Sequence, residues 1–101
     1  MKELNGTEKQ VKWAMDIRQR KLEKIEKVKG SRGMFRNYYN VYVLATGKEI
    51  NPAEFKDLLD EVSQYIKDCE SSQFFIHMDK AEVASMICNY TLGNLDLYYT
   101  M

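Results

Sequence analysis

The segment Leu4–Lys29, LNGTEKQVKWAMDIRQRKLEKIEKVK, carries the strongest structural pattern in this chain. Thr7 stands just before a helical pattern, and Gln10 follows three residues later. This is the capping-box arrangement, in which each of the two side chains satisfies a backbone N–H group of the other residue. The pattern predicts a helix over residues 8–29.

The apolar residues of this predicted helix cover a face of roughly 200°, wider than the ~100° face that a surface helix needs. We therefore expect the helix to pack against more than one neighbour, with Trp13 and Ile17 buried. Arg18 and Lys21 fall inside the apolar face. Their aliphatic stems could lie along the edge of the core while their charged ends reach solvent or an acidic partner. The far side of the helix is basic and includes Arg20, Lys24 and Lys27.

Two further helices are predicted from capping signals. Asn51, Pro52 and Glu54 supply an N-cap, a proline at the first helical position and a second capping box. Apolar residues then recur at three-and-four spacing, which predicts a helix over residues 52–69 with an acidic outer face. Asp79 and Glu82 repeat the cap pattern and predict a third helix over residues 80–90.

Two short strands complete the predicted fold, which is α+β and mainly α. Residues 39–45 are rich in β-branched and aromatic side chains, which favour a strand, although the length also permits a short helix. Residues 95–99 alternate with the period of a half-buried strand, and we expect the two strands to pair so that their backbone groups are satisfied. The sequence leaves open whether residues 71–78 are extended or helical.

Composition predicts a single globular domain over residues 1–101. Charged residues make up 30% of the chain and hydrophobic residues 45%, which is typical of a globular protein. The net charge of zero conceals an asymmetry: residues 1–36 hold eleven Lys/Arg against five Asp/Glu, and residues 37–101 hold four against ten. Such a division suggests a basic surface for a polyanion or an acidic partner, or two halves that neutralise each other when packed.

The sequence also narrows the location and chemistry that we expect. No stretch approaches the ~20 apolar residues of a membrane span, so we expect a cytoplasmic protein without membrane contact. Cys69 and Cys88 are isolated, which favours buried reduced thiols. His77 is the only histidine and lies in an apolar run, where a packed histidine is more common than a catalytic base. No metal-ligand spacing or glycine-rich phosphate motif is present, so we expect no catalytic residue, no metal and no cofactor.

The first helix also carries a resemblance. The run Leu4, Asn5, Gly6, Thr7, Glu8, Lys9, Gln10, then Trp13, Ala14, Ile17 and Arg18, is similar to the opening of short uncharacterised proteins carried by bacterial phages and integrative elements. Those proteins share the pattern L-x-G-[ST]-E-K-Q-x-x-W-A-x-x-I-R. A shorter segment, SSQFFIHMDK at residues 71–80, resembles a later part of the same group, with His77 where an acid is usual. The resemblance implies a mobile-element setting, a bacterial host and a mostly helical fold, and it assigns no catalytic residue.

Two functions remain as hypotheses. The first is nucleic-acid binding, in which the basic residues of the first helix track a phosphate backbone and nearby aromatic rings stack on bases. Acidic residues interrupt that basic face, however, and the sequence pI of about 6.6 is low for such a domain.

The second hypothesis is protein binding, which we prefer because seven tyrosines, four phenylalanines, one tryptophan and six methionines are many large side chains for one small core. Tyr, Trp and Met are among the residue types that are enriched at interface centres. We expect a stoichiometric, non-catalytic protein that binds a larger host protein or ribonucleoprotein complex. Its size and setting suit an inhibitor of a host defence nuclease, as an anti-CRISPR protein inhibits a CRISPR effector. The sequence does not specify the oligomeric state. The expected partner-binding residues are Arg18, Arg20, Lys21, Lys24, Lys27, Arg32, Phe35, Arg36, Tyr38 and Tyr39.

Overall fold

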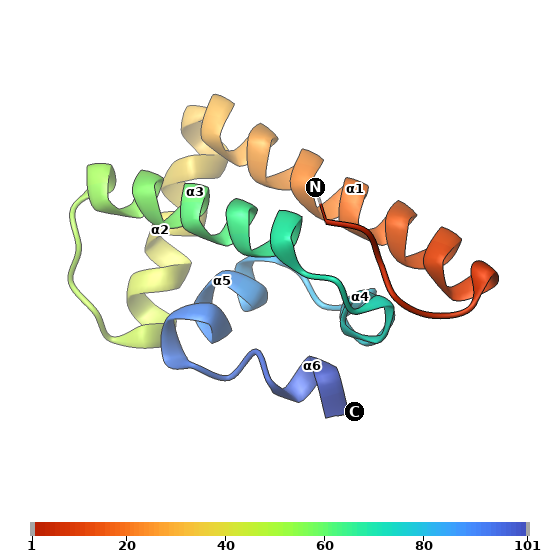
Figure 1. Cartoon of the computed structure of the whole chain (residues 1–101). Coiled ribbons are helices and arrows are strands. Elements are labelled where there is room, and N and C mark those ends of the chain that lie inside the picture. Colours follow the sequence, from red (N-terminus) through yellow and green to blue (C-terminus); the bar gives the residue numbers. More distant parts are fainter. Residues whose placement is uncertain (1, 101) are drawn as a thin grey trace.

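A computed structural model describes residues 2–100, and within that range the chain forms helices and no strand (Figure 1). The predicted α+β class is therefore wrong, and the described fold is all-α. In chain order the helices are α1 (Glu8–Gly30), α2 (Arg32–Thr46), α3 (Pro52–Asp68), α4 (Ser72–Met78), α5 (Val83–Leu92) and α6 (Leu97–Thr100).

The long first helix begins as predicted. The Thr7 side chain accepts a hydrogen bond from the Gln10 amide at 3.2 Å, and the Gln10 side chain accepts one from the Thr7 amide at 3.1 Å. Helix α1 contacts α2, α3, α4 and α5, which confirms that it has more than one neighbour.

Its buried face is nevertheless narrower than predicted. Ile17 is fully buried, but Trp13 is 50% exposed and Met15 is 52% exposed, so the expectation that Trp13 is buried is wrong. Trp13 and Met15 each lie about 100° around the helix from the buried Ala14, one to either side, at the edges of the apolar face. The buried positions lie between these edges and include Arg18 and Lys21.

Residues 39–45, predicted as a strand, form the second half of α2. Ser31 caps this helix by accepting a hydrogen bond from the Met34 amide, and Gly47 ends it with a positive φ of 69°. The aromatic residues that favoured a strand are spaced for a helix, because Phe35, Tyr39 and Tyr42 all reach the same ring, Phe55 of α3. Packing against α3 thus outweighs the intrinsic strand preference of these residues.

The second predicted strand, residues 95–99, is also absent. Leu95 lies in a turn and α6 follows it, with Leu95 and Tyr98 both buried in the core. An extended segment here would need a strand to pair with, and its expected partner is helical. Hydrogen bonds attach α6 instead: the Tyr98 carbonyl contacts His77 Nδ1 at 2.8 Å, and the Tyr99 and Tyr65 hydroxyls are 2.9 Å apart.

The remaining helices follow the predicted signals more closely. α3 begins with the Asn51–Glu54 capping box. Residues 71–78, which the sequence left open, contain the short helix α4, capped by Ser71. The predicted helix over residues 80–90 runs instead from Val83 to Leu92, because Asp79 follows the end of α4 rather than beginning a new helix.

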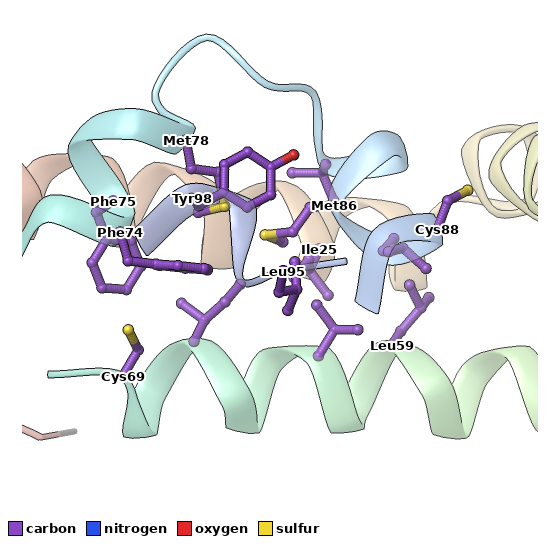
Figure 2. Packing of buried hydrophobic residues seen from close by; sticks show 14 of the residues in the cluster. Ile25, Leu59, Cys69, Phe74, Phe75, Met78, Met86, Cys88, Leu95 and Tyr98 are labelled. Atoms are coloured by element: carbon purple, nitrogen blue, oxygen red, sulfur yellow. The ribbon is translucent and has the colours of Figure 1, made fainter. Parts of the chain in front are cut away.

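The buried side chains form a single cluster to which all six helices contribute. Figure 2 shows Ile25 of α1, Leu59 of α3 and Met86 of α5 converging at its centre, with Phe74 and Phe75 of α4 at one end. Both cysteines are buried and unpaired. Within residues 2–100, none of the helices combines the length and apolar character needed to cross a bilayer.

The segment that precedes α1 lies along the end of α3. The Lys2 amide donates to the Lys67 carbonyl at 2.9 Å, and the Asn5 amide donates to the Glu70 carbonyl at 2.7 Å. Gly6 then turns the chain into α1 with a φ of 135°, where a side chain would be strained and a Cβ atom would lie 3.0 Å from the Gln10 side-chain oxygen. This glycine therefore allows the N-terminal segment and α1 to pack on the same end of α4.

Candidate partner-binding surface

A basic hollow of about 420 Å³ lies between α1, the middle of α2 and the connection from α4 to α5. We call it the basic hollow throughout. Four cationic side chains and one carboxylate contribute to its wall. The lining residues are Arg20, Lys21, Lys24, Tyr38, Lys80, Ala81, Glu82 and Val83.

Arg20 forms one wall of the hollow and is already paired. Its Nε atom lies 3.0 Å from Asp16 Oδ2, one turn back on α1, and its Nη2 atom lies 2.8 Å from Asp79 Oδ1. The hydrogen bonds to Asp79 and Asp16 raise the pKa of the guanidinium. Arg20 therefore positions the α4–α5 connection against α1, and much of its charge is compensated.

Lys21 is buried at the base of the hollow, with 8% of its surface exposed. Its ammonium group donates to the Asp79 and Ala81 carbonyl oxygens, which belong to the connection between α4 and α5. Burial lowers the pKa of this group, and the nearby Arg20 charge lowers it further, although Asp79 and Glu82 act in the opposite direction. Lys21 thus fixes the α4–α5 connection, which forms one wall of the hollow, against α1.

Lys24 and Lys80 differ from these two residues because both are exposed. Within residues 2–100, neither ammonium group has a hydrogen-bond or ion-pair partner. The Tyr38 hydroxyl lies in the same hollow, and burial, with a smaller effect of Glu82, raises its pKa so that it stays a neutral donor. Two unpaired ammonium groups and a hydroxyl donor are suited to binding carboxylate or phosphate oxygens.

The first turn of α5 adds partial positive charge at the same place. Glu82 occupies the N-cap position of α5, but its side chain makes no capping hydrogen bond. The amide groups of a helix's first turn carry the positive end of the helix dipole. Val83, the first residue of α5, lines the hollow.

An apolar groove of about 360 Å³ adjoins the hollow, because Glu82 lines both. We call it the α2–α5 groove. Val41 and Leu92 in its wall are 41% and 47% exposed, and the neighbouring Leu44 is 85% exposed. Burial raises the pKa of the Cys88 thiol in this groove, which keeps the sulfur protonated. The lining residues are Val41, Ala45, Glu82, Ala84, Ser85, Cys88, Asn89 and Leu92.

The structure gathers only part of the predicted binding set at the hollow. Arg20, Lys21, Lys24 and Tyr38 meet there. Arg18 does not: it is 6% exposed, donates from Nη1 to the Lys2 carbonyl at 2.8 Å and lies over the Phe75 ring at 5.9 Å.

The other predicted residues lie elsewhere. Phe35, Arg36 and Tyr39 line a separate hollow of about 330 Å³ beside Pro52, where the Phe35 and Tyr39 rings pack edge-on against a core phenylalanine. Lys27 and Arg32 are exposed and line none of these cavities.

Sequence reasoning missed Lys80 and the α2–α5 groove. The Asp79 and Glu82 cap signal placed Lys80 in a helix, and no local pattern predicted that it would meet Lys24 from a helix more than fifty residues away in the chain. The groove did have a signal: residues 37–47 and 83–95 contain no charged residue, although charged residues make up 30% of the chain.

The charge asymmetry of the sequence is partly resolved by packing. Lys29 of α1 pairs with Asp60 of α3 at 2.5 Å, and Arg20 pairs with Asp79, so two ion pairs join the basic and acidic halves. The hydrogen bond to Asp60 raises the pKa of Lys29. Among residues 2–100, the basic hollow brings together two ammonium groups without an ion pair, those of Lys24 and Lys80, beside an apolar groove.

No cluster of three or more His, Cys, Asp or Glu side chains among residues 2–100 is arranged to hold a metal ion. Comparisons with protein-family models, with curated proteins and with solved structures find no match.

Proposed function

We propose that this chain is a small non-catalytic protein that acts stoichiometrically, by binding an acidic surface of a larger host protein or ribonucleoprotein complex. The observation that carries the proposal is the pair of unpaired ammonium groups of Lys24 and Lys80 in the basic hollow. Charged groups of one sign in a concave site attract and orient a partner of opposite sign. Lys21 and Arg20 hold the wall of this site rigid, so little ordering is needed when a partner binds.

The adjoining surface favours protein over nucleic acid as the partner. A nucleic-acid site typically has a continuous basic stripe, whereas here Glu82 lies between the basic hollow and the α2–α5 groove. The residues that line the groove include no Lys or Arg to contact a phosphate backbone, and apolar area is typical of the centre of a protein interface.

A finer proposal names the partner. The resemblance of the first helix to phage and integrative-element proteins supports a setting in the bacterial cytoplasm and a host defence nuclease, such as a CRISPR effector, as the target. A stoichiometric inhibitor would stop cleavage at about one protein per nuclease complex, because each copy occupies one site. Titration of a CRISPR effector cleavage assay measures this directly; undiminished cleavage at excess protein would exclude that target.

The experiment that tests the broader proposal is a pull-down from a bacterial host lysate with quantified recovery of co-purifying proteins. The charge-reversed variant Lys24→Glu with Lys80→Glu should lose its partner, because both reversed residues are exposed and lie in the hollow. Its thermal unfolding should match that of the unsubstituted protein, because exposed substitutions usually change stability by less than about 0.5 kcal/mol.

The matched control is Lys9→Glu with Lys56→Glu, which makes the same change in net charge outside the hollow. Both residues are exposed, and Lys9 lies in the first turn of α1, where a carboxylate suits the helix dipole. This variant should keep the partner. If both double variants lose it, net charge rather than the hollow governs binding, and the proposal fails.

A gel-shift titration at two salt concentrations tests the nucleic-acid hypothesis separately. Phosphate contacts release counterions, so binding to naked DNA or RNA would weaken steeply as salt rises. We expect no such binding. Tight, salt-sensitive binding that Lys24→Glu with Lys80→Glu abolishes would assign the hollow to nucleic acid instead.

A further inference from the structure

The α2–α5 groove is an exposed surface with little charge in a highly charged chain: of its lining residues only Glu82, which it shares with the basic hollow, is charged. Its two walls come from residues 37–47 and 83–95, which hold no Asp, Glu, Lys or Arg. Two large apolar side chains that line the groove, Val41 and Leu92, nevertheless face solvent, as does the neighbouring Leu44. Depletion of charge together with exposed apolar area distinguishes the centre of an interface from ordinary surface.

The groove and the basic hollow form one continuous surface, with the hollow at one end and the groove at the other. Along α2, Tyr38 lines the hollow, and Val41 and Ala45 line the groove one and two turns further on. Along α5, Val83 lines the hollow and Leu92 lines the far end of the groove. The two helices lie beside each other in the fold (Figure 1). A ligand that lies along both helices therefore meets positive charge at one end, the Glu82 carboxylate where the hollow and the groove join, and mainly apolar side chains along the rest.

We propose that this combined surface binds a short segment of a partner protein that carries carboxylate side chains at one end and apolar side chains along the remainder. This inference rests on the proposed function and names the part of the partner that is bound. The carboxylates lie in the basic hollow beside Lys24 and Lys80, and the apolar side chains cover Val41 and Leu92. The ten residues of α5 span about 15 Å, which matches about three turns of helix in the partner.

A second copy of this chain fits the surface less well. The acidic region of this chain is the outer side of α3, where the exposed residues include Asp57, Asp60 and Glu61. Among the described residues, the large hydrophobic side chains that are well exposed lie on α1, α2 and α5 and none lies on α3. The acidic face of a second copy would match the hollow but would leave the groove uncovered, so the segment belongs to another protein.

The test uses a display library of random peptides of about twelve residues, a length that spans the groove as a helix. The library is selected against the full chain, and the enriched peptides are then measured against variants by fluorescence anisotropy. We expect enriched sequences to carry Asp or Glu on one side of a group of Leu, Ile or Phe residues.

Two variants should weaken binding of these peptides by about tenfold or more, which corresponds to about 1.4 kcal/mol. They are Lys24→Glu with Lys80→Glu in the hollow and Val41→Gln with Leu92→Gln in the groove. The matched control is Trp13→Gln with Met15→Gln, which removes two exposed apolar side chains of α1 that line neither cavity. The control should bind the peptides unchanged. Circular dichroism melts verify that all three variants are folded.

Several outcomes would overturn the inference while leaving the proposed function intact. One is enrichment of purely acidic peptides that bind the groove variant as tightly as the unsubstituted protein; another is the absence of any enriched sequence. A third is a dimer in light scattering that Val41→Gln with Leu92→Gln dissociates, because a second copy would then occupy the groove. The proposed function itself is tested separately by the pull-down. It fails if Lys24→Glu with Lys80→Glu recovers the host partner as well as the unsubstituted protein does.

Discussion

Two pairs of basic residues on and around α1 have opposite environments. Arg18 and Lys21 are 6% and 8% exposed, and their charged ends are bonded to backbone carbonyls of distant segments. Lys24 and Lys80 are exposed and have no partner among the described residues. The difference teaches that basic residues in this region differ in role: Arg18 and Lys21 assemble the fold, and Lys24 and Lys80 are available to the partner that we propose.

The buried pair acts as two attachment points. Arg18 holds the N-terminal segment through the Lys2 carbonyl, and Lys21 holds the α4–α5 connection through the Asp79 and Ala81 carbonyls. Charged donors to backbone carbonyls are stronger than neutral ones, so each contact offsets part of the cost of burying a cation. If this division of roles is correct, substitutions of the buried pair should lower stability and should spare peptide binding per folded molecule.

The largest effect is expected for Arg18→Ala. This change removes the hydrogen bond to the Lys2 carbonyl, the contact with the Phe75 ring and the packing of the aliphatic stem. We expect a loss of about 2–3 kcal/mol in the free energy of unfolding, measured by urea titration. Lys27→Ala is the control, because Lys27 is exposed on the same helix without an ion pair, and it should change stability by less than about 0.5 kcal/mol. Equal losses in the two variants would remove the distinction between the buried and exposed cations.

A smaller effect is expected for Lys21→Met, which keeps the apolar stem and removes the ammonium group. The Asp79 and Ala81 carbonyls then lose their donor, which should cost about 1–2 kcal/mol of unfolding free energy near pH 7. Hydrogen exchange should show faster opening of the α4–α5 connection, with α3 protected as before. Unchanged exchange in that connection would mean that Lys21 does not hold it.

The smallest expected effect is a pH dependence that belongs to Lys21. Burial lowers the pKa of this ammonium group below its ordinary value of 10.5. In the alkaline range just below that value, the unfolded chain therefore keeps a proton that the folded chain has released, and the contribution of Lys21 to stability rises with pH. The difference in unfolding free energy between the unsubstituted protein and Lys21→Met should thus grow as the pH rises toward 10.5, the ordinary pKa of the ammonium group. A constant difference would show that the ammonium group has its ordinary pKa.

Helix α1 and helix α3 could be predicted from the sequence because their determinants are local. Capping boxes at Thr7 and Asn51 act within one turn, and the apolar spacing that follows is read within the same segment. The start of α5 was predicted too early in the chain. Asp79 is a residue type common at the N-cap of a helix, but here it follows directly on the last residue of α4.

The aromatic segment of α2 could not be assigned in the same way. The residues of α2 favour a strand intrinsically. The helix is favoured instead by packing, because three aromatic rings of α2 contact Phe55 of α3. The candidate site has a similar limit. Arg20, Lys21, Lys24 and Tyr38 were identified by residue type, but the meeting of Lys24 with Lys80 depends on how α1 packs against the α4–α5 connection. The groove was missed, and the signal that could have indicated it is the lack of charged residues in 37–47 and 83–95.

The single residue between α1 and α2 has a consequence for engineering. Ser31 closes α1 by donating its amide to the Val28 carbonyl and opens α2 by accepting from the Met34 amide. One extra residue there would rotate and shift α2, and the Tyr38 and Val41 positions would move with it. The turn around Gly47 and Lys48, in contrast, is exposed, and a Cβ atom on Gly47 would meet nothing within 4 Å. A reporter loop or split-protein junction therefore belongs at that turn, where it can be added without redirecting α2.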